Sequence, residues 1–295
     1  MSSTIFKSEE AQHRMADWYQ RFLHRADIET TSIEVTTSYG VNHLLTAGDP
    51  SKTPLVCLHS MLTSSAHLLS EIASLAESFY LILPDMPGQS VKGLPLRLSY
   101  KDNSHAKWLR EILDALNLER AHFLGVSLGG FVARQFASAW PDRVQTLTLL
   151  VAAGIVQGSV VLGLAKMAGP MILYKIQPNE KRLRKVVDPL LTTWDTDWAN
   201  YLADTFNDFK PNYKIPPLAS DHELQKLSMP VLFIVAEKDI SFPGLQMIQR
   251  VEGLVPFAQT ELLKDSKHSP PTTPEFRQWL RSRVKKFVNT IQPVS

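Results

Sequence analysis

From Pro54 onwards, short apolar segments alternate with longer segments in which apolar residues recur at helical spacing. The short segments are rich in leucine, valine and isoleucine, which is typical of buried strands. They lie at residues 54–58, 79–83, 121–126, 144–150 and 230–236. Strands that are separated by helices pair in parallel, so the pattern predicts an α/β fold with a mainly parallel sheet that helices cover on both faces.

The start of the chain has a different pattern. Residues 7–26 carry apolar side chains at helical spacing, which predicts a helix. Residues 31–37 alternate between polar and apolar side chains, and a second stretch runs to Ala47 after a turn at Tyr39-Gly40. We therefore expect a hairpin between this first helix and the alternating region.

Residues 154–225 interrupt the alternation, because they contain helical signals such as Trp198 and Leu202 but no clear strand. We interpret them as a helical cap that is inserted late in the sheet and lies over the carboxyl ends of the strands. In open α/β sheets, ligands bind at that edge. The expected organisation is a core of residues 1–153 and 226–295 with a cap of residues 154–225.

The composition excludes several classes of protein. Apolar residues make up 44% and charged residues 20%, which is typical of a globular chain and not of a disordered or fibrous one. The 31 basic and 29 acidic residues give a net charge of +2, which does not favour binding to nucleic acid or to an anionic membrane. Cys57 is the single cysteine, so no intrachain disulfide can form. With no signal-peptide pattern and no apolar run of roughly 18–20 residues, we expect a cytoplasmic protein without a membrane span.

The sharpest motif runs from Gly125 to Gly129 and fits G-x-S-x-G, with Ser127 at its centre. It joins the strand pattern AHFLGV to the helix pattern LGGFVARQFASAW, which is the context that a nucleophile elbow requires. Such a turn exposes the serine hydroxyl, and the N–H of Leu128 at the helix N-terminus can then stabilise a developing oxyanion. The alternative interpretation is a serine in an ordinary tight turn.

A serine hydroxyl is a weak nucleophile until a base accepts its proton. Where this elbow occurs, the order along the chain is serine, acid, histidine. Only His222 and His268 follow Ser127, and His222 lies in the expected cap. His268 lies in a loop after the last apolar stretch, which favours it as the base.

The acid is expected in the loop after the strand at residues 230–236. Asp239 is the favoured partner of the histidine, and Glu237 is the alternative. The second oxyanion donor is expected in the loop that begins at His59, where the N–H of Met61 is the leading candidate. We expect His59 itself to brace this loop.

Taken together, these motifs resemble those of the α/β-hydrolase superfamily, and most closely its capped bacterial carboxylesterase-like branch. The resemblance runs over nearly the whole chain except the insertion, and it rests on His59-Ser60, D-x-P-G at residues 85–88, G-x-S-x-G-G at residues 125–130, Asp239 and His268. The chain departs from the family pattern at Ser60, where a glycine is usual, and at Gln89-Ser90-Val91, where the family often continues D-x-P-G-x-G-x-S.

The resemblance implies a serine hydrolase that cleaves a carboxylic ester through an acyl-enzyme on Ser127. Related dehalogenases and epoxide hydrolases need an aspartate at this position, which excludes them. The same triad also suits a carbon–carbon bond hydrolase or a thioesterase. A weakly catalytic ligand-binding protein on this fold is the third alternative, and Ser60 is its best support.

No metal or cofactor is expected, because no cluster of potential ligands and no phosphate-binding loop is apparent. The expected partner is a small acyl substrate with apolar groups. The apolar segment 159–174 of the cap either packs on the core or lines the acyl pocket. If it lines the pocket, Leu162, Met167 and Met171 are the expected wall residues.

Overall fold

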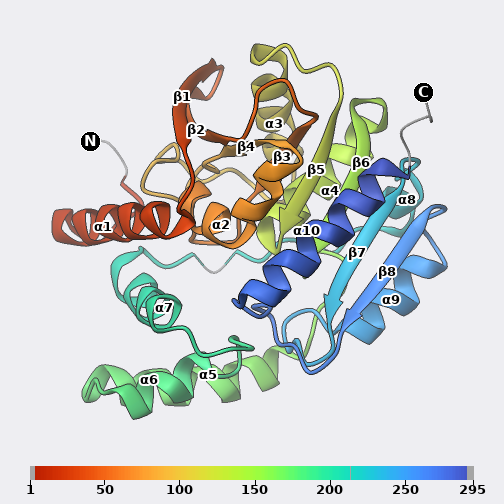
Figure 1. Cartoon of the computed structure of the whole chain (residues 1–295). Coiled ribbons are helices and arrows are strands. Elements are labelled where there is room, and N and C mark those ends of the chain that lie inside the picture. Colours follow the sequence, from red (N-terminus) through yellow and green to blue (C-terminus); the bar gives the residue numbers. More distant parts are fainter. Residues whose placement is uncertain (1–3, 213, 291–295) are drawn as a thin grey trace.

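An eight-stranded sheet organises the computed structural model, which describes residues 4–212 and 214–290 except for the side chains of residues 160, 162–164, 167 and 168 (Figure 1). The strands are β1 (Thr30–Thr37), β2 (Gly40–Ala47), β3 (Pro54–Leu58), β4 (Tyr80–Pro84), β5 (Ala121–Val126), β6 (Val144–Leu150), β7 (Val231–Ala236) and β8 (Ala258–Leu263). Their order is β1-β2-β4-β3-β5-β6-β7-β8. The β1–β2 and β2–β4 pairs are antiparallel and the other neighbours are parallel, which confirms the predicted sheet.

Helices cover both faces of the sheet, as the alternating pattern predicts. One face carries α1 (Glu9–Ala26), α2 (Ser65–Ile72), η1 (Ala73–Glu77) and α10 (Pro274–Asn289). The other face carries α3 (Ser104–Ala115), α4 (Leu128–Ala139) and α9 (Gly244–Glu252), and η2 (Pro141–Arg143) leads from α4 into β6. Each set of helices packs on the sheet through its own apolar cluster, because an amphipathic helix must bury its apolar stripe. Figure 1 shows α2 and α10 in front of the sheet, and α3 and α4 behind it.

A helical insert lies between β6 and β7, as predicted. It consists of α5 (Val160–Ile176), α6 (Glu180–Val187), α7 (Thr196–Asp208) and α8 (Asp221–Gln225). Side chains of α6 and α7 form a separate apolar cluster, against which Met171 of α5 packs. The short α8 packs on α4 instead, and its Leu224 belongs to the core. None of the described helices, α5 included, is both long and apolar enough to cross a membrane.

Helix α1 ties the insert to the core. It begins after Ser8, whose hydroxyl accepts the N–H of Ala11, and it buries an apolar face on α2. Its opposite side carries arginines that form ion pairs with aspartates of α7 and its N-cap. These pairs are Arg14–Asp208, Arg21–Asp197 and Arg25–Asp195. Figure 1 accordingly shows α1 and α7 on the same side of the molecule.

Candidate active site

Ser127 occupies a strained turn between β5 and α4. Its backbone dihedrals are φ 51° and ψ −111°, which a residue with a side chain adopts only where the surroundings enforce it. The surroundings are crowded: a Cβ at Gly125 would lie 2.6 Å from the Gly129 carbonyl oxygen, and one at Gly130 would lie 2.6 Å from the Cβ of Ala152. The glycines of the motif therefore allow the strand and the helix to approach closely enough to form the elbow.

The structure brings Ser127, His268 and Asp239 together. The Ser127 Oγ lies 3.0 Å from Nε2 of His268, and the His268 Nδ1 lies 2.8 Å from Oδ2 of Asp239. His268 stands in the loop between β8 and α10, and Asp239 stands in the loop after β7. This chain of hydrogen bonds is the arrangement that an activated serine nucleophile needs.

Asp239 is held in place by its own loop. Its Oδ1 accepts the backbone N–H groups of Ser241 at 2.7 Å and Phe242 at 3.0 Å, which leaves Oδ2 facing the imidazole. The alternative acid, Glu237, accepts the N–H of Asp265 at 2.8 Å instead. The other candidate base, His222, is exposed on α8.

Two backbone N–H groups are available as oxyanion donors. The N–H of Leu128 is the first of α4, and the first N–H groups of a helix have no partner within the helix. No hydrogen bond in the described part of the chain uses the N–H of Met61. Met61 lines the same pocket as Ser127, and Leu128 follows Ser127 directly in the chain. Their role in catalysis stays a proposal.

Two hydrogen bonds to the backbone of Leu62 hold the loop that carries Met61. Leu62 has a positive φ of 53°, whereas Ser60 does not appear among the residues with positive φ in the described chain. Gln89 Oε1 accepts the Leu62 N–H at 3.0 Å, and the Tyr201 hydroxyl of α7 donates to the Leu62 carbonyl oxygen. These two roles were not predicted from the sequence, although Gln89 belongs to the segment 89–91 that departs from the family pattern.

His59 braces the same loop, as expected. Its Nδ1 donates to the Ser60 carbonyl oxygen at 2.9 Å, and its Nε2 accepts the N–H of Met86 at 2.9 Å. Burial lowers the pKa of His59, so the ring stays neutral and keeps these two roles. The Asp85 carboxylate accepts the N–H and the hydroxyl of Ser65 just beyond the loop, at 3.0 and 2.6 Å.

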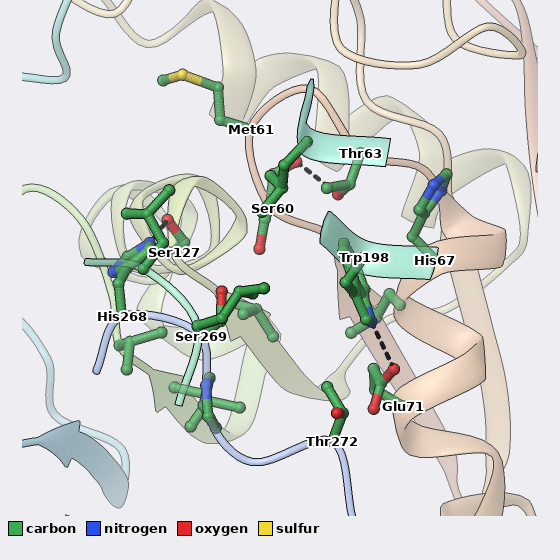
Figure 2. Close-up of a pocket in the computed structure, with 18 of the residues that line it drawn as sticks. Ser60, Met61, Thr63, His67, Glu71, Ser127, Trp198, His268, Ser269 and Thr272 are labelled. Atoms are coloured by element: carbon green, nitrogen blue, oxygen red, sulfur yellow. Dashed lines mark hydrogen bonds between the residues drawn. The ribbon is translucent and has the colours of Figure 1, made fainter. Parts of the chain in front are cut away.

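A pocket of about 290 Å³ opens beside Ser127 and runs between the strand ends and the insert. Its apolar lining comes from both parts of the chain and includes Leu62, Leu68, Ile72, Val126, Leu150, Leu191, Leu202, Phe206 and Leu280. Figure 2 shows Ser127 and His268 on one side of this pocket, His67 and Glu71 on the opposite side, and Ser60 between them. The insert therefore helps to enclose the space beside the candidate nucleophile.

Of the three cap residues that the sequence suggested for this wall, Met171 has a described side chain, and it is not among the residues that line the pocket. Met171 packs, partly buried, against the cluster of α6 and α7. The side chains of Leu162 and Met167 lie outside those that the structure describes. The insert contributes Leu191, which precedes α7, and residues of α7 such as Trp198 to the lining.

The polar end of the pocket was not predicted from the sequence. Trp198 Nε1 donates to Glu71 Oε1 at 2.8 Å, and Arg277 donates to Glu71 Oε2 at 2.9 and 3.1 Å. His67 lies one helical turn before Glu71 on α2. No sequence signal identified these residues, because they come from helices far apart in the chain. Within residues 4–212 and 214–290, no group of three potential metal ligands is present.

Comparisons with known proteins agree with the fold described above. A family described as "alpha/beta hydrolase fold" matches residues 53–185. Two proteins of Bacillus subtilis are similar over nearly the whole chain. The uncharacterized carboxylesterase nap is 24% identical, and the match covers 100% of this chain and 98% of the relative. Carboxylesterase YbfK is 25% identical, and the match covers 97% of each chain. Among solved structures, the naproxen esterase of Bacillus subtilis superposes with a TM-score of 0.79 at 21% identity, covering 95% of this chain and 99% of that one.

Proposed function

Because this chain has the α/β-hydrolase fold and is a distant, full-length homologue of two Bacillus carboxylesterases, we propose that it is a serine hydrolase that cleaves carboxylic esters. The observation that carries the proposal is the hydrogen-bonded chain from Ser127 Oγ through His268 to Asp239. It stands at the mouth of an apolar pocket, where the acyl or alcohol group of an ester can be bound away from water.

In the proposed reaction, Ser127 Oγ attacks the ester carbonyl carbon while His268 Nε2 accepts the hydroxyl proton. The N–H groups of Met61 and Leu128 stabilise the negative charge on the carbonyl oxygen. The tetrahedral intermediate releases the alcohol, which takes the proton from His268 and leaves an acyl-enzyme. A water molecule, deprotonated by His268, then attacks the acyl group and restores the Ser127 hydroxyl. Throughout, Asp239 holds the imidazole so that Nε2 faces Ser127.

The charge of the pocket favours a neutral substrate. No lysine or arginine is present among the described residues that line it, and Glu71, its acid, is paired with Arg25 and Arg277. A diketone-like acid, the substrate of a carbon–carbon bond hydrolase, carries a carboxylate that needs a cationic partner when buried. The apolar lining therefore favours an ester with apolar groups over such an acid.

The proposal is tested with a fluorophosphonate probe and an ester panel. The probe should label the parent protein at Ser127, and Ser127→Ala should lose both the label and ester hydrolysis, by about 10³-fold or more. The Ser127 hydroxyl does not contribute to core packing, so circular dichroism and the melting temperature of the variant should match the parent. Hydrolysis that survives in Ser127→Ala would refute the assignment.

The same panel separates the alternatives. It should include straight-chain esters, matched thioesters and a diketo acid. Faster cleavage of the thioester than of the ester would make the protein a thioesterase, and cleavage of the diketo acid alone would make it a carbon–carbon bond hydrolase. Ligand binding without labelling of Ser127 would support the weakly catalytic alternative.

A further inference from the structure

The insert and the loop that carries His268 are joined along the backbone. Leu191 of the insert, which follows α6, forms a parallel bridge with Ser269. The Ser269 N–H donates to the Leu190 carbonyl oxygen at 2.8 Å, and the Thr192 N–H donates to the Ser269 carbonyl oxygen at 3.2 Å. The insert therefore holds the residue that directly follows the candidate base.

The side chain of Thr192 adds a second pair of contacts, one on each side of His268. Its hydroxyl Oγ1 donates to the Ser269 carbonyl oxygen at 2.6 Å and accepts the N–H of Lys267 at 2.8 Å. One hydroxyl thus bonds to the residue before the histidine and to the residue after it. Because both partners are backbone atoms, these bonds fix the course of the chain at His268 itself.

Residues 267–269 form their backbone hydrogen bonds with the insert. In the described part of the chain, none of these bonds goes to the core. The core contacts the loop one residue earlier, where the Ser266 carbonyl oxygen accepts the Lys238 N–H at 2.8 Å. The ammonium group of Lys267 also donates to Asp188 of the insert, at 2.7 Å from the carbonyl oxygen and 3.0 Å from Oδ1. The insert thus sets the position of the histidine backbone.

The imidazole of His268 depends on this backbone because it must reach two partners at once. Its Nε2 lies 3.0 Å from Ser127 Oγ, and its Nδ1 lies 2.8 Å from Asp239 Oδ2. Ser127 is fixed by its strained turn, and Asp239 is fixed by the N–H groups of its own loop. A displacement of residues 267–269 therefore lengthens at least one of the two hydrogen bonds of the histidine.

We propose that Thr192 is a positioning residue for catalysis, because its hydroxyl holds residues 267–269 where the His268 imidazole reaches Ser127 and Asp239 together. This inference rests on the proposed function and makes the insert part of what places the base. Among the described residues that line the pocket, Leu191 is present but Thr192 is not. Thr192 therefore acts through the histidine and does not touch the substrate.

The test compares kcat and KM for a simple ester between the parent and Thr192→Val. Valine keeps the shape of threonine but can neither accept the Lys267 N–H nor donate to the Ser269 carbonyl oxygen. The kcat of the variant should fall by about 10–100-fold, because a small displacement of a reacting group has a large effect on rate. KM should stay within about twofold of the parent, as expected for a residue that does not touch the substrate. Thr192→Ser restores the hydroxyl and should recover most of the lost kcat.

The matched control is Thr193→Val, the same substitution at the next residue of the insert. The Thr193 Oγ1 also has two partners on the loop, the N–H and the hydroxyl of Thr272, each at 3.0 Å. These contacts lie farther along the loop, beyond Pro270 and Pro271, so they do not flank His268. Thr193→Val should lower the melting temperature about as much as Thr192→Val but leave kcat close to that of the parent. An unchanged kcat in Thr192→Val, or an equal fall in both valine variants, would overturn the proposal.

A second measurement needs no turnover. The His268 Nδ1 proton, which is donated to Asp239, should give a downfield proton NMR resonance that is absent from His268→Gln. This resonance should shift or broaden in Thr192→Val and stay as in the parent in Thr193→Val. An unchanged resonance in Thr192→Val would contradict the positioning role. If Thr192→Val does not fold, Thr192→Ala removes the same hydroxyl, and Thr193→Ala then serves as its control.

The two measurements distinguish a failure of this inference from a failure of the proposed function. If the resonance changes in Thr192→Val but the parent neither hydrolyses an ester nor reacts with the fluorophosphonate probe, the proposed function fails and the positioning of His268 stands. If the parent hydrolyses esters and Thr192→Val does so at the same rate, the positioning role fails and the proposed function stands.

Discussion

The hydroxyl of Tyr201 donates a hydrogen bond to the carbonyl oxygen of Leu62 and so joins α7 of the insert to the loop after β3. Leu62 follows Met61, the residue whose N–H we propose as an oxyanion donor. Burial raises the pKa of Tyr201, so the phenol remains a neutral donor at all ordinary pH values. Through this contact, the insert helps to set the conformation of the loop beside Ser127.

Tyr201→Phe should lower kcat by about tenfold and leave KM nearly unchanged, because the Leu62 carbonyl loses its partner and the Met61 N–H is less well placed. Phenylalanine keeps the ring that packs on His67, so the variant isolates the hydroxyl. Steady-state kinetics on a simple ester measure the effect. A rise in KM with no change in kcat would show that Tyr201 contributes to binding alone.

Gln89→Met provides a partner experiment, since it removes the acceptor of the Leu62 N–H while keeping the length of the side chain. If both contacts hold the same loop conformation, the rise in activation free energy in the Gln89→Met/Tyr201→Phe double variant should be smaller than the sum of the rises in the two single variants. Strict additivity would mean that the two contacts act independently.

Asp239→Asn should lower kcat by about 10³–10⁴-fold. The two backbone N–H groups that bind Oδ1 would retain the amide oxygen, so the amide NH₂ would face the imidazole and impose a tautomer that cannot accept the Ser127 proton. Glu237→Gln is the matched control, and its rate should stay within a few-fold of the parent. The opposite ranking of the two variants would transfer the role to Glu237.

Ser60→Gly should raise neither the melting temperature nor kcat. The resemblance to the family places a glycine at residue 60, and a glycine would relieve strain there only at a positive φ, but the positive φ in this loop belongs to Leu62. The Ser60 carbonyl oxygen is already fixed by His59 Nδ1 and by the Thr63 hydroxyl, each at 2.9 Å. A gain in both quantities, measured by thermal melting and ester turnover, would place the strain at residue 60 after all.

Stability should fall as the pH drops from about 6.5 to 4, in part because of two buried histidines. Burial lowers the pKa of His105 and of His122 from 6.5 to about 4. In this window the unfolded chain binds protons that the folded chain does not, so acid favours unfolding. At 1.36 kcal/mol per pKa unit, each histidine contributes up to about 3 kcal/mol to this loss.

Urea unfolding at pH 7 and pH 4.5 tests this linkage. His122→Gln should lose less stability between the two pH values than the parent, because its buried side chain no longer titrates. The control is His13→Gln, a substitution at an exposed position of α1, which should lose as much as the parent. If His122→Gln and the parent lose equal stability, His122 does not contribute to the acid sensitivity.

The elements of the fold follow from local patterns in the sequence. The strands at 54–58, 121–126 and 144–150 are found at the predicted residues, and the helix predicted at residues 7–26 is α1. The turn at Ser127 was also predictable, because glycines on both sides of the serine permit a geometry that other residues would block. The order of serine, acid and histidine then selected His268 and Asp239, which the structure brings together.

The lining of the pocket was not predictable in the same way. Met171 was an expected wall residue, yet it packs on α6 and α7, while Tyr201 and Trp198 of α7 reach the loop after β3 and the residues of α2. Helical spacing of apolar residues shows which face of a helix is buried. It does not specify what that face packs against, because the hydrophobic effect is non-directional. Residue type and spacing therefore sufficed for the elements and the nucleophile turn. The placement of His67 and Glu71 was decided by the packing of helices that are distant in the chain, and that of Gln89 by the meeting of the loops after β3 and β4, because only the assembled core fixes which hydrogen-bonding groups meet.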